Sequence, residues 1–207
     1  MGRLTYAAML QCFSFLFSGS MNALAGSPCG VAHQEHTGGG GRTMSGEDFV
    51  PFPPPTREVV SPNGQFSFVI SSPAVGKTKD LSTGQLFRGT SRARKLVWEK
   101  KLPQEQGPRY ALVGNQGEVA LFDEWNNVKS RYAVVLINVH RNFERSHDFD
   151  AVATVLGEPV ARIVEQARVG WWLQGPPTVD DSGASAYAMA AGKCLAIDLN
   201  TGNMTLR

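Results

Sequence analysis

The sequence predicts a mainly β domain of stacked antiparallel β-meanders with a small two-helix insert. Three observations predict this fold class. A glycine-containing turn recurs three times, at Gly64, Gly117 and Gly183. A short apolar strand follows each turn. Only residues 148–168 show the three- and four-residue apolar spacing of amphipathic helices.

The three turns share one order of residues. They are Asn63-Gly64 in "TREVVSPNGQFSFVI", Gln116-Gly117 in "RYALVGNQGEVALFDEW" and Ser182-Gly183 in "PTVDDSGASAYAMAA". Glycine suits such a turn because it adopts positive φ without a Cβ clash. We therefore expect each of these glycines to have positive φ, or to flank a residue that does, and to open a hairpin.

A second strand is expected after each turn-strand unit. These strands are predicted at residues 94–102, 132–139 and 194–207, where apolar residues recur. The first unit is lengthened by a connection around residues 71–91. The interval between the second and third turns is lengthened by the helical insert.

The helical insert is predicted as two short helices, near residues 148–156 and 159–168. Gly157 and Pro159 interrupt the pattern, and proline belongs in a first turn and not in a helix interior. The apolar stripe from Val152 to Ala167 predicts a lid packed on the β domain, with Ile163 buried. The alternative is a free recognition helix with an exposed stripe.

The N-terminal residues 1–25 have the features of a secretory signal peptide. Arg3 precedes an apolar stretch from Tyr6 to Phe17, and Ala23-Leu24-Ala25 forms a small-x-small cleavage site. We expect export to the periplasm or the extracellular space, and no transmembrane segment in the mature chain. Residues 26–56 form a Gly- and Pro-rich linker, and the folded domain is expected over residues 57–207.

Composition constrains the partner and the redox state. The net charge of +2 falls to about +1 after cleavage, which argues against a general polyanion binder, and no nucleic-acid partner is expected. Cys29 and Cys194 remain in the mature chain. In an oxidising compartment they can form one disulfide, and the alternative is two separate free thiols.

Two phrases resemble the repeats of bacterial β-propeller proteins. "SPNGQFSFVI" is similar to the turn and strand of such repeats, and "CLAIDLNTGNM" resembles quinoprotein-like repeats through Ile197, Asp198, Thr201 and Gly202. The resemblance implies a propeller-like fold and a recognition or scaffold role, and it carries over no cofactor-binding set. Three copies are fewer than the four blades of a closed propeller, so a small propeller, an open stack of meanders and a sandwich remain open.

An acidic-aromatic cluster in "FDEWNN" supplies the first candidate site residues. Asp123, Glu124, Asn126 and Asn127 surround Trp125, and their oxygens are of the kind that binds Ca²⁺. The cluster lacks the regular spacing of a calcium loop. The preferred interpretation is structural, with Asp123 capping the loop through backbone amides. Asp123 and Trp125 are kept as candidate ligand-binding residues.

A basic cluster and a pair of tryptophans supply the others. The cations are Arg88, Arg92, Arg94, Lys95, Lys100 and Lys101. They are typical either of a surface that meets an acidic partner or of the solvated face of an edge hairpin. Arg94 is the candidate contact. Of Trp171 and Trp172, one is expected under the helices and the other at the surface, with Trp172 as the candidate contact.

Metal, nucleotide and catalytic patterns are weaker. His33, Glu35 and His36 lie in the linker without a third histidine nearby, so no metal site is predicted. "SSPAVGKT", residues 71–78, nearly matches a phosphate loop with Lys77, but Ser71 replaces its first glycine and no convincing helix follows.

The sequence therefore predicts an exported binding or scaffold domain, without a cofactor, for an unknown protein or glycan ligand. The alternative is a hydrolase-type enzyme with a loop-built site. Its candidate bases are His140 and His147, and its candidate nucleophiles are Ser61, Ser182 and Ser185. A deep pocket around either histidine favours the enzyme. An exposed Trp125 or basic cluster favours the binding domain.

Overall fold

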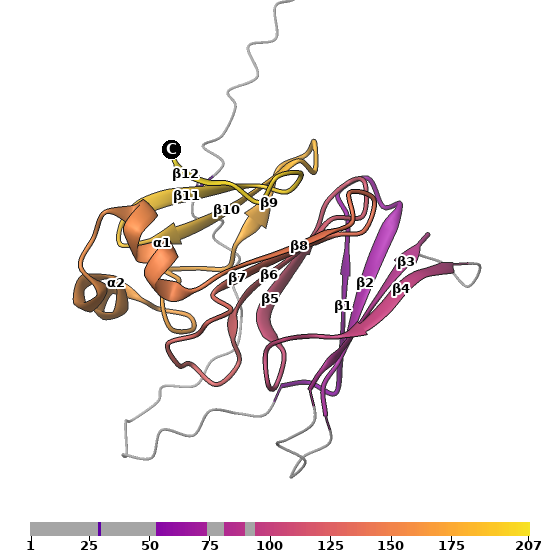
Figure 1. The fold of residues 1–207 in the computed structure, drawn as a ribbon, viewed down its shortest axis with the longest axis horizontal. Coiled ribbons are helices and arrows are strands. Elements are labelled where there is room, and N and C mark those ends of the chain that lie inside the picture. Colours follow the sequence, from indigo (N-terminus) through magenta and orange to yellow (C-terminus); the bar gives the residue numbers. More distant parts are fainter. Residues whose placement is uncertain (1–28, 30–52, 74–80, 90–93) are drawn as a thin grey trace, which may run out of the picture.

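The computed structural model describes residue 29 and residues 53–73, 81–89 and 94–207. Within them the chain is mainly β, with three four-stranded antiparallel sheets and two helices. The predicted signal peptide and nearly all of the predicted linker lie outside the described residues. Figure 1 shows the second sheet between the other two, with both helices on the side of the third sheet.

Each sheet is a meander whose strands follow one another in chain order. The first sheet contains β1 (Thr56–Val60), β2 (Phe66–Ser71), β3 (Thr83–Arg88) and β4 (Lys95–Lys101). The second contains β5 (Pro108–Val113), β6 (Val119–Glu124), β7 (Val134–Asn138) and β8 (Phe143–His147). The third contains β9 (Thr178–Val179), β10 (Ser185–Ala190), β11 (Lys193–Asp198) and β12 (Met204–Leu206).

The three predicted turns are equivalent in the structure. Gly64, Gly117 and Gly183 have φ values of +68°, +88° and +67°, and each lies between the first and second strands of its sheet. In every turn the glycine N–H donates to the carbonyl oxygen three residues earlier. The prediction of positive φ and of a hairpin at each glycine is confirmed.

The expected two-strand unit is wrong, because each sheet has four strands. The connection around residues 71–91 contains β3, and the first unit's predicted second strand, residues 94–102, is the fourth strand of its sheet. In β3 the regular apolar alternation is broken by Gly84, where an added Cβ would lie 2.6 Å from the Phe68 ring. In β8, Glu144 to Ser146 are exposed at a sheet edge, so this strand also lacks an apolar signal.

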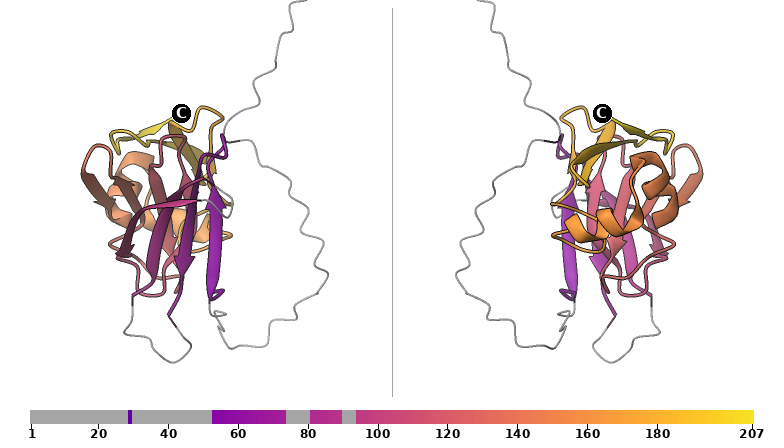
Figure 2. Two further views of the ribbon diagram at one scale, coloured as in Figure 1. Left: turned by 90° about the vertical axis from the view of Figure 1, so that its right-hand side faces the viewer. Right: turned by 90° about the vertical axis from the view of Figure 1, so that its left-hand side faces the viewer.

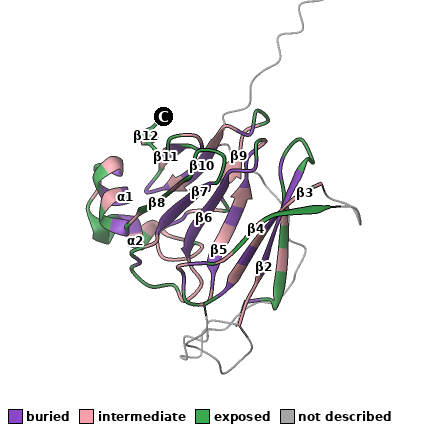
Figure 3. Cartoon of the chain, turned by 45° about the vertical axis from the view of Figure 1, so that its right-hand side comes forward, coloured by how far each residue is buried: buried purple, intermediate pink, exposed green. Residues whose placement is uncertain are grey.

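The central strands of the second sheet, β6 and β7, are buried on both faces. Along β6, Val119 and Leu121 join a cluster with the first sheet, whereas Ala120 and Phe122 join a cluster with the third sheet and the helices. Its neighbour β7 divides its side chains in the same way. A strand with two buried faces needs apolar residues at every position, which explains the continuous run "VVLI". Figure 3 shows these central strands as buried.

The two helices form the predicted lid. Helix α1 (Phe149–Leu156) begins after Asp148, whose side chain accepts a hydrogen bond from the Ala151 N–H, and ends at Gly157 with φ +61°. Helix α2 (Val160–Gln166) buries Ile163 completely. The packed-lid interpretation is confirmed by this burial. Neither helix is long and apolar enough to cross a membrane.

One asparagine joins the turns of all three sheets. The backbone N–H of Asn63 in the first turn donates to Asn115 Oδ1 (2.9 Å), and Asn63 Nδ2 donates to the Asn115 carbonyl (3.1 Å). On the other side, the Asn115 N–H and Nδ2 donate to the carbonyl oxygens of Gly183 (3.3 Å) and Asp181 (3.0 Å). These bonds fix the relative positions of the sheets at one end.

Candidate functional site

The candidate residues lie in four separate places. Asp123 and Trp125 lie on either side of Glu124, the last residue of β6, and Arg94 lies just before the start of β4. Trp172 is in the core, and Cys194 is on β11, where it is bonded to Cys29. Only Asp123 and Trp125 are brought into one cluster.

Asp123 is buried and acts as a loop cap. Its backbone has φ +56°, which an L-residue adopts only when the surroundings hold it there. Oδ1 accepts from the Glu124 N–H (3.0 Å) and Oδ2 from the Trp171 N–H (2.5 Å). Gly170 fits tightly against this carboxyl, since an added Cβ would lie 2.0 Å from Oδ2. The side chain therefore holds the 170–171 segment against the second sheet.

Burial raises the pKa of Asp123 to about 6, against the effect of its two backbone hydrogen bonds and of nearby Arg109, which favour the ionised form. The carboxyl is fully enclosed, so it is withdrawn from any surface ligand. Glu124, its neighbour in the calcium interpretation, accepts from Ser130 Oγ (2.5 Å). Within the described residues, no group of three or more metal-ligating acids, histidines or cysteines occurs.

Trp125 lies between sheet ends under two arginines that sequence reasoning missed. The guanidinium carbons of Arg57 and Arg109 are 5.0 and 5.4 Å from the ring centroid. Arg57 also donates to the carbonyl oxygens of Pro108 (2.6 Å) and Arg109 (3.0 Å), and Arg109 donates to the Trp125 carbonyl (2.7 Å). Burial, and secondarily Arg109, lower the pKa of Arg57. This cluster joins the first sheet to the second.

A sequence signal for the two arginines does exist. Arg57 and Arg109 each occupy the second position of the first strand in their sheet. They lie seven residues before Gly64 and eight before Gly117, so the turn alignment brings them to the same end of the two sheets but offset by one residue. The corresponding position in the third sheet is Val179, so the pattern is not threefold.

Arg94 lies across the outer face of the first sheet. Its guanidinium carbon is 4.1 Å from the Phe87 ring centroid, and Nη1 forms an ion pair with Glu58 Oε1 at 2.7 Å. Strand register places Phe87 beside Ser67 on one side and Leu96 on the other. Arg94 therefore spans the sheet from β4 toward β1. Arg92 of the same basic cluster lies outside the described residues.

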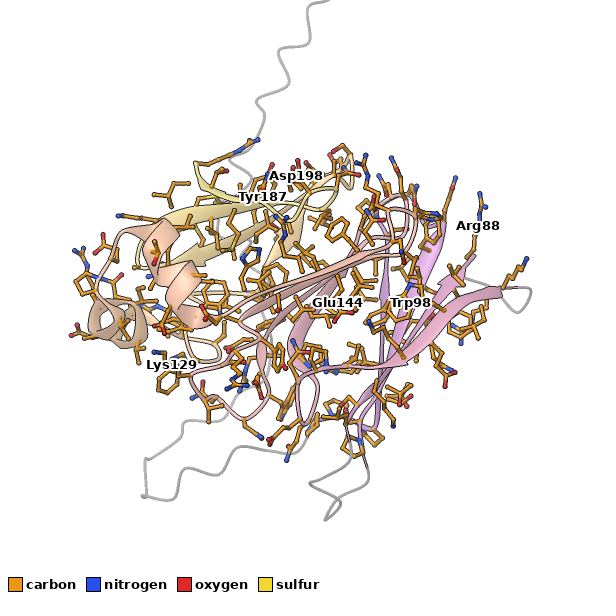
Figure 4. All side chains as sticks on the ribbon, in the orientation of Figure 1. Arg88, Trp98, Lys129, Glu144, Tyr187 and Asp198 are labelled. Carbon is orange, nitrogen blue, oxygen red and sulfur yellow. A yellow bond between two sulfur atoms is a disulfide. The ribbon has the colours of Figure 1, made fainter. Side chains whose placement is uncertain are left out.

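Apolar and cationic side chains are exposed together around β3 and β4. Val60 and Leu96 are each 46% exposed, and Val97 is 38% exposed in a bulge opposite Leu86 and Phe87. We call this region the basic outer surface; it comprises Val60, Phe87, Leu96 and Val97 with the cations Arg94 and Lys101, and with the exposed Arg88 and Lys95 at the tip of the sheet, where their register with Phe66 turns them toward the inner face. Figure 4 places Arg88 at the end of the first sheet far from the helices.

Lys100 points to the opposite side of the sheet. It forms an ion pair with Glu144 of β8, in the region between the first and second sheets where Trp98 also lies (Figure 4). Trp98 packs against Phe68 with ring centroids 5.4 Å apart. The inner side of β4 is thus anchored to the core, while its outer side and tip carry the exposed residues.

Trp172 is not a surface contact. Its side chain is fully buried in the cluster beneath the helices, because the tight 167–174 loop turns it inward beside Leu173. Trp171 is the partly exposed member of the pair, and its backbone N–H is bound to Asp123. The candidate assignment of Trp172 as a ligand contact is corrected on this ground.

The candidate catalytic residues are dispersed. His147 Nε2 lies 2.8 Å from the Gly202 carbonyl, and His140 is exposed in the β7–β8 turn. Ser61 and Ser182 bond within their own turns. An open cavity of about 450 Å³ is lined by Glu165, Gln166, Ala167, Arg168 and Gln174, and so by neither histidine. Lys77 of the phosphate-loop pattern lies outside the described residues, and β3, a strand, is the first element described after it.

Cys29 and Cys194 form a disulfide that spans 165 residues, with their Cα atoms 5.9 Å apart. Cys194 pairs in register with Met189, on the face of β11 opposite to the buried Leu195 and Ile197. The bond therefore attaches Cys29, which precedes the first sheet in the sequence, to the outer face of the third sheet. Figure 2 shows from both sides how the third sheet lies over one end of the second.

Comparison of the chain with protein-family models, with curated proteins and with solved structures finds no match.

Proposed function

We propose that the chain is an exported binding domain that holds an acidic ligand on its basic outer surface. The observation that carries the proposal is the joint exposure of Val60, Leu96 and Val97 next to Arg94 and Lys95. Apolar side chains on a sheet face cost free energy in water unless a partner covers them. The surrounding cations select a partner of opposite charge.

The charge of the first sheet supports an acidic ligand. Its described strands and flanks contain Arg57, Arg88, Arg94, Lys95, Lys100 and Lys101 against Glu58 and Glu99. Both acids already have partners, since Glu58 pairs with Arg94 and Glu99 accepts from Gln85. The cations are therefore in local excess on a chain whose overall charge is nearly balanced.

Within the same proposal, the fold is an open, propeller-like stack. Three meander sheets succeed one another in chain order, and Asn115 ties their first turns together. Three sheets are fewer than a closed propeller needs, so such a stack ends in two outer faces. The basic outer surface is on one of them, and the Cys29–Cys194 disulfide is on the other.

Export is the second part of the proposal. It rests on the signal-peptide features of residues 1–25, and a disulfide suits an oxidising compartment. N-terminal sequencing of the secreted or periplasmic protein should begin at Gly26. A mature protein that begins at Met1 contradicts export by this route.

The binding function is tested with arrays of acidic peptides and acidic glycans. The wild-type domain should retain at least one acidic probe, and the K95E/K101E variant should bind it at least about tenfold more weakly because attraction becomes repulsion. The matched control is R131E/R141E, which makes the same charge change at exposed positions outside the first sheet. No binding to any acidic probe, or equal weakening by both variants, contradicts the proposal.

The hydrolase alternative has its own test. A panel of ester, amide and glycoside substrates should show no turnover by the purified domain above a boiled control. Turnover that is lost in His140→Ala or His147→Ala would replace the binding proposal with an enzymatic one.

A further inference from the structure

The free edge of the first sheet is formed by β4. Among the described strands β4 pairs only with β3, so one row of its backbone donors and acceptors lacks a strand partner. With seven residues it is the longest strand in the described part of the chain. An edge of this length is a template for a further strand.

This edge is held firmly in place. The Phe68–Trp98 contact anchors its centre, and the Lys100–Glu144 ion pair links it to β8 of the next sheet. Little conformational entropy is lost at such an edge when another strand binds, because the backbone of β4 is already extended and fixed. The side chains that remain exposed include Lys95, Leu96 and Lys101.

Charge decides which strand fits. If two copies of β4 paired antiparallel about Trp98, Lys95 of each copy would lie near Lys101 of the other. Like charges placed opposite each other across a sheet are destabilising, so the lysines oppose self-pairing. The same two lysines attract carboxylates at both ends of an incoming strand. The exposed Leu96 and Val97 lie between them and suit apolar residues in its middle.

We propose that β4 binds an extended acidic segment of a partner protein by strand addition. The segment spans about seven residues, carries Asp or Glu toward each end and has apolar residues between them. Backbone hydrogen bonds supply affinity, and the lysines supply specificity and register. This inference rests on the proposed binding function and names its partner as polypeptide rather than glycan.

The first experiment is selection from a displayed peptide library. Each varied position of the library can be an acidic residue, threonine or a branched apolar residue. Selected peptides should carry carboxylates toward both ends. They should bind K95E/K101E at least about tenfold more weakly than wild type and R131E/R141E unchanged. Replacing the terminal acids of the peptide by lysine should restore binding to K95E/K101E, which mere misfolding of that variant would not allow.

The second experiment locates the bound peptide. Amide hydrogen exchange should slow in residues 95–101 when the peptide binds, and a peptide N-methylated at alternate residues should lose binding. A bound peptide that leaves exchange in β4 unchanged overturns strand addition. So does a domain that binds acidic glycans but no acidic peptide, although that result preserves the proposed function. Binding to no acidic probe of either kind overturns both, and dimerisation through β4 overturns the acidic-strand assignment.

Discussion

At Asp123 a single buried carboxyl couples protonation to folding. Its pKa of about 6 is above the ordinary 3.8, so between these values the folded state binds a proton that the unfolded state releases. Ionisation of Asp123 therefore removes stability as the pH rises from about 4 through 6, on the order of 3 kcal/mol in full. Well below pH 3.8 the carboxyl is protonated in both states and this penalty is absent.

We predict that Asp123→Asn becomes progressively more favourable relative to wild type between pH 4 and 7. The variant loses one of the two acceptors for backbone amides, but that loss is independent of pH. Urea unfolding of both proteins across the pH range measures the difference, and carboxyl NMR of Asp123 gives the midpoint directly. A constant difference, or a midpoint near 4, contradicts the assignment.

Two glycines separate backbone strain from packing at the seam between the sheets. Gly64 and Gly183 have nearly equal φ values, +68° and +67°, so alanine meets the same backbone strain at both. An added Cβ at Gly64 meets nothing within 4 Å, whereas at Gly183 it lies 2.4 Å from the Asn115 backbone nitrogen. Gly183 therefore permits the close approach of the second and third turns.

We expect Gly64→Ala to cost about 1 kcal/mol of unfolding free energy, from the left-handed backbone alone. Gly183→Ala should cost a further 1 to 3 kcal/mol, on the order of other overpacked sites. Chemical denaturation of the two variants compares them directly. Equal losses of unfolding free energy in the two variants would show that the hydrogen-bonded contact at Asn115 can shift to make room for the added methyl group without destabilising the fold.

At the scale of elements, α1 and α2 stabilise the fold through one shared apolar face. Ile163 is fully buried in the cluster that joins the helices to the second and third sheets, while Val160 on the same helix is 40% exposed. Ile163→Ala should lower the unfolding free energy by about 2 to 5 kcal/mol. Val160→Ala should change it by less than about 0.5 kcal/mol. Thermal melting of both variants tests this, and an unchanged melting temperature for Ile163→Ala would reject the lid.

Elements with a strong local pattern were predictable, and elements defined by their neighbours were not. The turns at Gly64, Gly117 and Gly183 need positive φ, and the helices show a regular spacing of apolar residues. A few neighbouring residues are therefore enough to identify both kinds of element. β3 and β8 are strands because adjacent strands offer them hydrogen bonds. Neither has a regular apolar alternation, since Gly84 and Gln85 precede Leu86 in β3 and three exposed polar residues follow Phe143 in β8. Only the paired sheet identifies them.

The site was predicted in part for the same reason. The loop-capping role of Asp123 follows from its residue type and turn position. Its bond to Trp171, 48 residues away, depends on how the sheets pack, as do the contacts of Arg57 and Arg109 with Trp125. The inward direction of Trp172 likewise depends on the 167–174 loop, which a sequence pattern does not specify.

At the scale of the whole molecule, the sheets are joined mainly by burial, with a polar seam at one end. Two apolar clusters lie on opposite faces of the second sheet, and neither contains a cysteine. The arrangement makes the second sheet common to both clusters. A destabilising change in β6 or β7 therefore weakens the packing of the second sheet against both the first and the third sheets. A change in β2 weakens only the packing between the first and second sheets.

The disulfide between Cys29 and Cys194 adds a constraint of another kind. It closes a loop over a separation of 165 residues. In the chain-entropy model, a cross-link over a loop of this length lowers the entropy of the unfolded chain and thereby raises its free energy by about 5 kcal/mol at room temperature. Because both apolar clusters exclude the cysteines, the reduced protein should keep its fold. We predict a lower urea midpoint after reduction, with β-sheet circular dichroism unchanged in buffer.

The C29S/C194S variant should match the reduced wild type, which controls for effects of the reductant. A mature oxidised protein that labels with a thiol reagent under denaturing conditions would contradict the bond. An unchanged urea midpoint after confirmed reduction would show that the link does not constrain the unfolded chain.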